Sequence, residues 1–287
     1  MTSTSEKINY LLTSILKRVK GSKNFCPFCK TDLKNASLVD KKFIVTSLCE
    51  CPKCNLLVRI PADDVQQSNE FYQSAYSQEY TTDCPSDEVL QTLVASNFRD
   101  TDRDYSRYMR FFDFLGVKSD ARVLDFGCSW GYGLHQFRQR GYNAEGFEVS
   151  LPRASYGKEK MKLPIYSSVQ DLKGKYDVIF SSHVLEHLPD FSEINDLYLN
   201  HLSDNGLFVA ITPNGSNDFL KADYNAYHQL WGKVHPVLLN DKFVRLNFKN
   251  ELIYLDSWNT MSPEFNPHKF AEKIDKYELV YVLKRRA

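Results

Sequence analysis

The 287-residue sequence has no apolar run near the about 20 residues that a membrane-spanning helix needs. It also has no excess charge of one sign, because 36 Lys and Arg residues balance 36 Asp and Glu residues. The N-terminus lacks the apolar stretch and cleavage site of a signal peptide. These absences argue against a membrane-spanning protein and against one that holds nucleic acid by global basic charge. We expect a cytoplasmic protein, with nucleic acid not among its partners.

Internal repeats and long low-complexity tracts are also missing, whereas hydrophobic residues make up 43% of the chain. A chain of this length and composition can bury a substantial core. The composition therefore predicts a globular protein with one large domain or two modest ones.

The first 20 residues carry apolar side chains at a spacing that places them on one face of a helix. These side chains belong to Ile8, Leu11, Leu12, Ile15, Leu16 and Val19. Basic residues surround them, so the helix could lie on a membrane surface. We favour packing on the protein itself or on a second subunit of a homodimer, since such stripes usually belong to a core.

Four of the seven cysteines form two close pairs, in Cys26-Pro-Phe-Cys29 and Cys51-Pro-Lys-Cys54. Zinc takes four tetrahedral ligands, with sulfur at about 2.3 Å, and a CxxC turn supplies two thiolates to one ion. In a reducing compartment, such pairs are typical of metal ligands rather than disulfides. The pattern resembles a zinc ribbon, and four cysteines leave no open position, so the zinc would be structural. A redox pair or coincidental cysteines are the alternatives.

Strand-like and helix-like segments alternate in the second part of the chain. Strands are predicted over 122–126, 144–149, 176–181 and 207–212, and helices over 105–115, 132–140, 152–161 and 191–202. Alternation of this kind predicts an α/β domain with a mostly parallel sheet covered by helices. The tail segments 252–255 and 279–283 could add two more strands.

The chain is therefore expected to divide into four parts. They are an amphipathic helix over 1–23, the zinc ribbon over 24–62, a tyrosine-rich connector over 63–100 and the α/β domain over 101–287. Tyr76 and Tyr80 of the connector could close over a site as a lid and exclude water. Ordinary packing between domains is the alternative that we favour.

The segment Val123–Gly133 is the most informative part of the sequence, because an apolar strand runs into a glycine-rich turn and then a helix. Gly127 and Gly131 allow a ligand to approach the backbone closely, and the helix N-terminus offers free N–H groups. Glu148 follows at the end of the next strand, where a carboxylate can accept both hydroxyls of a ribose. This order predicts an adenosyl cofactor; a dinucleotide enzyme or a degenerate, non-catalytic fold are the alternatives.

From about residue 100 to 257 the sequence resembles the class I S-adenosylmethionine-dependent methyltransferases. It is most similar to the branch that methylates small molecules and sugars, through the segment His183-Val-Leu-Glu186-His187-Leu-Pro-Asp190. The resemblance implies a Rossmann-like methyltransferase fold with S-adenosylmethionine as the cofactor.

The resemblance also implies which residues bind the cofactor. Asp125, Gly127 and Gly131 would hold its amino-acid part, and Glu148 would hold its ribose. Ser129 stands where the family usually has the middle glycine of the turn.

The adenine would be framed by the segment Ser167–Asp171, which includes Ser168 and Val169. An aspartate is often found in the family at the position of Ser168. This departure leaves the contact to the adenine amino group unassigned.

Methyl transfer is a direct displacement at a sulfonium methyl group, so the protein must align the acceptor and, for a hydroxyl, remove a proton. Histidine suits this task near neutral pH. By similarity to sugar and small-molecule relatives, His235 is our candidate for the base or the acceptor-orienting group, and His228 is a weaker one. His183 is the other catalytic candidate and would line the cofactor or substrate pocket, unless it is a structural histidine. Glu186 and His187 are expected to tie a turn to the next helix.

The sequence thus predicts a methyltransferase that O-methylates a hydroxyl of a sugar, a surface-polysaccharide precursor or a similar small metabolite. Methylation of carbon or nitrogen stays an open alternative, because the motifs report cofactor binding more than acceptor chemistry. One alternative is a methyltransferase that the zinc ribbon guides to RNA or protein. Ser181-Ser-His-Val stands where many amino-nitrogen methylases have Asn/Asp-Pro-Pro-aromatic, which argues against methylation of bases. A non-catalytic, zinc-stapled binding module is the other alternative, and Asp125 and Glu148 argue against it.

Overall fold

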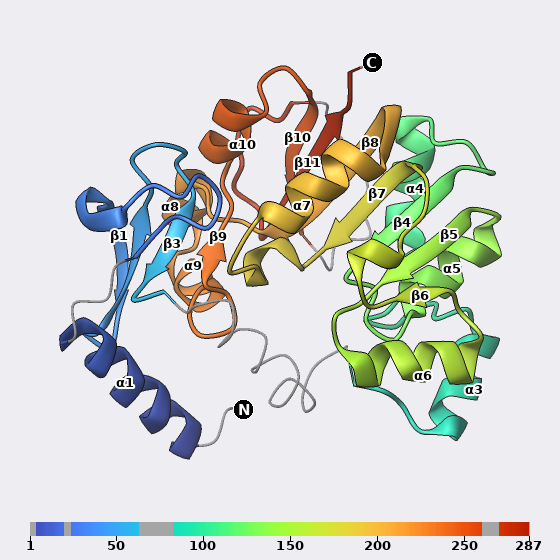
Figure 1. Ribbon diagram of the computed structural model, residues 1–287, viewed down its shortest axis with the longest axis horizontal. Coiled ribbons are helices and arrows are strands. Elements are labelled where there is room, and N and C mark those ends of the chain that lie inside the picture. Colours follow the sequence, from blue (N-terminus) through green and yellow to red (C-terminus); the bar gives the residue numbers. More distant parts are fainter. Residues whose placement is uncertain (1–3, 20–23, 63–82, 260–269, 287) are drawn as a thin grey trace.

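The structure is a computed structural model in which the strands form two sheets. It describes residues 4–19, 24–62, 83–259 and 270–286 (Figure 1). The seven-stranded sheet and its helices occupy one side of the molecule, and the four-stranded sheet and helix α1 (Thr4–Val19) occupy the other (Figure 1). The predicted lid residues Tyr76 and Tyr80 lie outside the described residues.

The large sheet has the strand order β10-β11-β8-β7-β4-β5-β6. Its strands are β4 (Arg122–Phe126), β5 (Asn143–Phe147), β6 (Ile165–Tyr166), β7 (Tyr176–Ser182), β8 (Leu202–Pro213), β10 (Leu252–Trp258) and β11 (Glu278–Lys284). Neighbours from β6 to β8 are parallel, whereas β11 runs antiparallel to both β8 and β10. This confirms the predicted Rossmann-like, mostly parallel sheet, including the two strands expected in the tail.

Helices cover both faces of this sheet. The helices after β3 are α3 (Asp87–Ala95), α4 (Ser106–Leu115), α5 (Tyr132–Arg140), α6 (Leu151–Met161), α7 (Ser192–Asp196), α8 (Asn217–Ala222), α9 (Tyr224–Leu230) and α10 (Asp241–Asn247). Short helical turns are η1 (Leu33–Asn35), η2 (Val169–Asp171), η3 (Leu185–His187) and the π-helical η4 (Leu197–His201). Successive strand residues face opposite sides, so Val123 is buried with α4 and α5 while Leu124 is buried with α7. In the part of the chain that the structure describes, no helix has the length and apolar character to cross a membrane.

Three of the four strands in the small sheet come from the cysteine-bearing segment, residues 24–62. The antiparallel strands of this sheet lie in the order β1 (Ser37–Lys42), β2 (Thr46–Glu50), β3 (Leu57–Ile60) and β9 (Val237–Leu238). The last strand comes from the C-terminal half of the chain, with Leu57 opposite Leu238 and Val58 opposite Val237. Strand pairing therefore links the predicted zinc-ribbon segment to the α/β domain.

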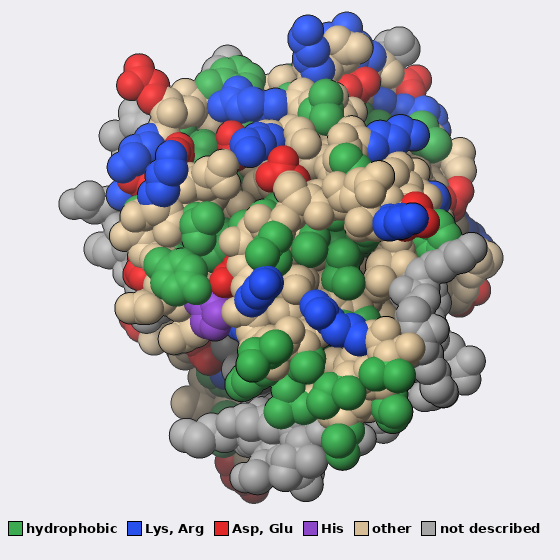
Figure 2. Space-filling view, turned by 90° about the vertical axis from the view of Figure 1, so that its left-hand side faces the viewer, with side chains coloured by type: hydrophobic (Ala, Val, Ile, Leu, Met, Phe, Trp, Pro, Cys, Tyr) green, Lys and Arg blue, Asp and Glu red, His purple; other side chains and the backbone are tan. Residues whose placement is uncertain are grey.

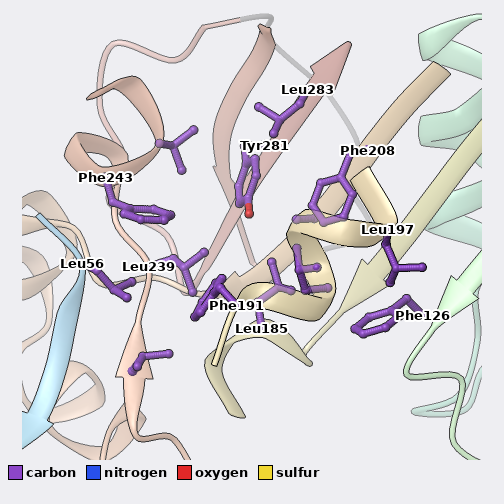
Figure 3. Packing of buried hydrophobic residues seen from close by; sticks show 14 of the residues in the cluster. Leu56, Phe126, Leu185, Phe191, Leu197, Phe208, Leu239, Phe243, Tyr281 and Leu283 are labelled. Atoms are coloured by element: carbon purple, nitrogen blue, oxygen red, sulfur yellow. The ribbon is translucent and has the colours of Figure 1, made fainter. Parts of the chain in front are cut away.

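One hydrophobic cluster also runs between the two sheets (Figure 3). Leu56, beside β3, and Phe126, at the end of β4, both belong to it. Phe243 of α10 belongs to the same cluster, and its ring meets that of Phe28 edge-on at 4.9 Å between centroids. Because Phe28 is part of the first cysteine turn, this turn is packed into the core that supports the large sheet.

Helix α1 contacts the small sheet through polar side chains. Arg59 on β3 donates to the Tyr10 hydroxyl at 3.1 Å, and Arg18 donates to Ser47 Oγ at 2.9 Å. Four residues of the predicted apolar stripe are exposed: Leu12, Ile15, Leu16 and Val19. Hydrophobic side chains are visible on this side of the molecule (Figure 2). A helix therefore forms in the predicted segment, but much of its apolar face points away from the core.

Replacing Phe243 by Ala should lower the free energy of unfolding by about 3–5 kcal/mol, because it removes a buried aromatic side chain and leaves a cavity. Leu246→Ala on the same helix is the matched control, since Leu246 is 54% exposed and Phe243 only 1%. The control should lose less than about 1 kcal/mol. Urea denaturation of zinc-saturated protein measures both values, and equal losses would contradict a shared core.

Candidate active site

The predicted glycine turn lies at the carboxyl end of β4. Gly127 has φ +82° and Gly131 has φ +92°, a region that glycine enters without steric cost. The amides of Gly127 and Cys128 donate to Phe147 O at 2.8 and 3.0 Å, which ties the turn to β5. A Cβ on Gly127 would lie 2.2 Å from Val184 Cγ2. The loop after β7 therefore packs directly on the turn.

Glu148 lies at the same edge of the sheet, directly after β5, and is nearly buried. The amides of Ser129 and Ser150 donate to its two carboxylate oxygens at 2.9 and 2.7 Å. Burial raises the pKa of Glu148, while these hydrogen bonds and the charge of Arg153 act against the rise. Each carboxylate oxygen can accept more than one hydrogen bond, so Glu148 can also receive hydroxyl groups of a ligand.

Several buried polar atoms around the turn have no hydrogen-bond partner among the described residues. They include Asp125 Oδ2, Ser129 Oγ and Trp130 Nε1. Burial, together with the charge of Glu148, raises the pKa of Asp125 to about 8. Since buried polar groups are nearly always hydrogen-bonded, these atoms leave hydrogen-bonding capacity for a polar ligand at the turn, and the Asp125 carboxyl group is compatible with a positively charged one. The ammonium and sulfonium groups of S-adenosylmethionine fit this requirement.

The segment predicted to frame the adenine follows β6. Ser168 directly precedes η2, its hydroxyl donates to Gln170 Oε1, and Val169 is buried. Asp125, Glu148 and Ser168 thus lie at or just after the carboxyl ends of three adjacent parallel strands. Ligands of open α/β sheets bind at this edge.

His183 follows β7 with φ +55° and lies between two buried carboxylates. Its Nε2 is 2.8 Å from Glu278 Oε1, and its Nδ1 is 3.4 Å from Glu186 Oε1. Burial alone would lower the pKa of His183, but its contacts with Glu186 and Glu278 raise it to about 10. The imidazole therefore carries protons on both nitrogens at neutral pH and acts as a hydrogen-bond donor.

Glu278, the first residue of β11, is a member of this network that the sequence analysis missed. Its side chain is fully buried, and Arg107 on α4 donates to both of its oxygens, at 3.1 and 3.3 Å. The signal in the sequence is a single acidic residue before the apolar run 279–283. An acidic residue usually lies in solvent. Here β11 runs antiparallel to β8, so its first residue, Glu278, lies opposite the end of β8 and next to His183.

A second cluster forms at η3, where His187 and His235 meet with their ring centroids 4.7 Å apart. The Nδ1 atom of His187 is 2.8 Å from Val234 O, and that of His235 is 2.5 Å from Leu230 O. Glu186, His187 and His235 each offer one possible metal-ligand atom, and these atoms lie within 4.8 Å of one another. The structure thus brings His235 to the segment that follows β7.

His228, the weaker candidate, has different partners. Its Nδ1 lies 2.7 Å from Asp40 Oδ2, which also accepts a hydrogen bond from Trp231 Nε1 at 2.8 Å. These contacts tie α9 to β1 of the small sheet, so His228 is oriented by a structural carboxylate.

A sequence model of a methyltransferase-domain family matches residues 99–252, more than half of the chain. The chain belongs to this methyltransferase family. The matched region includes the glycine turn, Glu148 and the segment from His183 to His187. Together with the residues that fit the cofactor, this makes the protein an S-adenosylmethionine-dependent methyltransferase. A search of curated protein sequences finds no match.

Several solved structures, methyltransferases among them, are similar to this methyltransferase at low identity. They include TehB from Haemophilus influenzae, with 16% identity over 62% of each chain and a TM-score of 0.44. A methyltransferase from Archaeoglobus fulgidus has 18% identity over 68% of this chain and 99% of its own, with a TM-score of 0.45. Magnesium protoporphyrin IX methyltransferase from Synechocystis has 14% identity over 79% of this chain and 99% of its own, with a TM-score of 0.49. The acceptor of this chain does not follow from such distant likeness.

The sulfur atoms of the four cysteines predicted as zinc ligands lie close together in the structure. Cys26 Sγ is 3.5 Å from Cys54 Sγ, and Cys29 Sγ is 3.6 Å from Cys51 Sγ. All four sulfur atoms lie within 4.8 Å of one another. Four sulfurs held at about 2.3 Å around one tetrahedral zinc ion would be about 3.8 Å apart. The cluster is therefore compatible with a structural zinc site.

Replacing Cys26 or Cys54 by Ser should lower bound zinc from one equivalent to well below one per chain, because a structural site needs all four thiolates. Elemental analysis of the purified variants measures the zinc content. Cys84→Ser is the matched control and should keep its zinc, since Cys84 is exposed and lies outside the cluster. Full zinc content in both cluster variants would overturn the site.

The affinity for S-adenosylmethionine should rise on the order of tenfold from about pH 6.5 to about pH 8.5 and then level off. Without cofactor the pKa of Asp125 is about 8, so its carboxyl group is mostly protonated at neutral pH. The cationic cofactor favours the carboxylate and lowers this pKa. Binding therefore releases a proton and becomes stronger as the pH approaches the pKa of the free protein.

Isothermal titration calorimetry across this pH range measures the affinity, and Asp125→Asn is the control. The amino group of the cofactor titrates alike in both experiments, so the ratio of the wild-type to the variant affinity isolates residue 125. If the ratio does not change with pH, Asp125 is not the carboxylate that binds the cationic cofactor.

Proposed function

We propose that this methyltransferase transfers the methyl group of S-adenosylmethionine to a hydroxyl of a sugar, a surface-polysaccharide precursor or a similar small metabolite. The observation that carries the proposal is the cluster of histidines and carboxylates that follows β7. Val184 lies between His183 and Glu186 and packs on Gly127, so this cluster adjoins the cofactor turn. A hydroxyl acceptor needs a group that orients it and accepts its proton, and an imidazole can do both.

The turn and the neighbouring strand ends would hold the cofactor. In this proposal its contacts are Asp125, Gly127, Gly131, Glu148, Ser168, Val169 and His183. When bound, S-adenosylmethionine supplies the electrophilic methyl group and the thioether leaving group. The protein's own task is then to hold the acceptor oxygen in line with the S–CH3 bond.

We place His235 at the acceptor. Its ring is partly exposed, and its Nδ1 donates to Leu230 O, so a neutral ring has its lone pair on Nε2. That lone pair can orient or deprotonate a hydroxyl. His183 takes a different role, because its contacts with Glu186 and Glu278 keep it protonated. We assign it to donate hydrogen bonds in the pocket rather than to remove a proton.

We also propose a cytoplasmic location. The four clustered cysteines would serve zinc as thiolates, and thiolate sites persist in a reducing compartment. Activated sugar precursors of surface polysaccharides are metabolites of the same compartment.

The test incubates the protein with methyl-labelled S-adenosylmethionine and fractionated bacterial extract. We expect label in the carbohydrate or nucleotide-sugar fraction, with the O-methyl group identified by NMR after hydrolysis. His235→Ala should then lower the labelling rate by about 10²-fold or more, the usual contribution of general acid–base catalysis. His201→Ala, which removes a histidine that contacts Gly174 O, should retain it. Label in RNA or protein would reject the acceptor class and assign recognition to the cysteine-bearing segment.

A further inference from the structure

Glu186, His187 and His235 have the composition of a metal site that is separate from the four cysteines. We propose that these three side chains bind one divalent transition-metal ion and that this ion holds the acceptor oxygen. Two imidazole nitrogens and one carboxylate suit ions such as Zn²⁺, Mn²⁺, Fe²⁺ or Co²⁺. The role toward the acceptor rests on the proposed function, whereas the binding of the ion does not.

The ligand atoms are already grouped before any ion binds. All three lie within 4.8 Å of one another, and Glu186 Oε1 is 3.9 Å from His187 Nε2. Two donors at about 2.1 Å from one ion lie about 3.0–3.4 Å apart. Inward shifts of about 1 Å therefore complete the site, which side-chain rotation can supply.

Backbone carbonyls determine which imidazole nitrogens face the site. The Nδ1 atoms of His187 and His235 lie 2.8 and 2.5 Å from Val234 O and Leu230 O. A carbonyl oxygen can only accept, so each Nδ1 carries a proton and a neutral ring has its lone pair on Nε2. Metal-binding histidines are typically oriented in this way by a carbonyl or carboxylate on their other nitrogen.

The carboxylate of Glu186 gives an independent reason to expect a cation. Its side chain is 0% exposed, and neither of its oxygens has a hydrogen-bond partner within the described parts of the chain. His183 Nδ1, at 3.4 Å from Oε1, forms an ion pair without hydrogen-bond geometry. A buried carboxylate without hydrogen bonds is unfavourable, and a bound cation would satisfy it.

The place of this site suits methyl transfer, because Val184 in the same segment packs on Gly127 of the cofactor turn. Three protein ligands leave positions open for the acceptor. A hydroxyl bound there has a lowered pKa, so its proton passes to water. With the ion present, the Nε2 lone pair of His235 binds the ion, so His235 orients the acceptor through the ion and does not itself remove the proton. Its oxygen then forms a bond to the methyl carbon while the S–CH3 bond breaks and the electron pair remains on sulfur. The charge of the ion is unchanged.

Two adjacent hydroxyls could both bind the ion, which favours a vicinal diol as the acceptor.

The test separates this site from the cysteine site by its stoichiometry. The full-length protein is treated with a weak chelator until one zinc per chain remains, and it is then titrated with Mn²⁺ without cofactor or acceptor. Electron paramagnetic resonance of unbound Mn²⁺ measures the binding. We expect one additional equivalent of Mn²⁺ in the wild type. Glu186→Gln and His235→Ala should weaken it about tenfold or more, without changing the zinc content.

Two controls keep this result interpretable. His201→Ala removes a histidine outside the cluster and should bind Mn²⁺ like the wild type. Because His235 is partly exposed, His235→Ala should stay folded, and circular dichroism verifies this. The metal site is rejected if the wild type binds no Mn²⁺ beyond its zinc, or if folded His235→Ala binds it with wild-type affinity.

The outcome is independent of the proposed acceptor class. If Mn²⁺ binds as expected but label enters RNA or protein, the metal site stands and the sugar acceptor fails. If carbohydrate is labelled by a protein that binds no Mn²⁺, the acceptor class stands and the metal site fails.

Discussion

The contact of Glu278 with His183 and Arg107 joins three elements that are far apart in the chain: β11, the loop after β7 and α4. Desolvation offsets much of the attraction in such a buried pair. These contacts therefore mainly fix the positions of the three elements. Removing His183 or Arg107 would leave the buried Glu278 carboxylate with one charged partner fewer. By fixing His183, the contact with Glu278 also fixes the following residues, including Val184, which packs on the glycine turn at Gly127.

The cysteine-bearing segment supports the acceptor side of the site in a different way. Arg59 on β3 donates from its backbone amide to Pro236 O at 2.8 Å, and from its side chain to Gly232 O at 3.2 Å. These bonds hold the stretch that contains His235 against the small sheet, and β9 continues the pairing. A metal bound by the cysteines would thus stabilise the position of a proposed active-site residue from a distance.

The core of the fold could be predicted from the sequence because its signals are local. The strand at 122–126 and the helix at 132–140 coincide with β4 and α5, since an apolar strand, a glycine turn and a helix follow one another within about twenty residues. The pairing of β9 with β3 could not be predicted. A two-residue strand has too few positions for periodicity, and its partner lies about 180 residues earlier in the sequence.

By itself the sequence determined the glycine-rich turn after β4, the carboxylates Asp125 and Glu148 beside it and the two CxxC pairs, because each depends on residues close together in the chain. The tertiary structure decided how the remaining polar groups combine. It placed Glu278 beside His183 through the reversal of β11, and His235 beside Glu186 through the packing of the two sheets. The physical reason is that contacts between distant segments depend on strand order and shared packing, which local spacing does not specify.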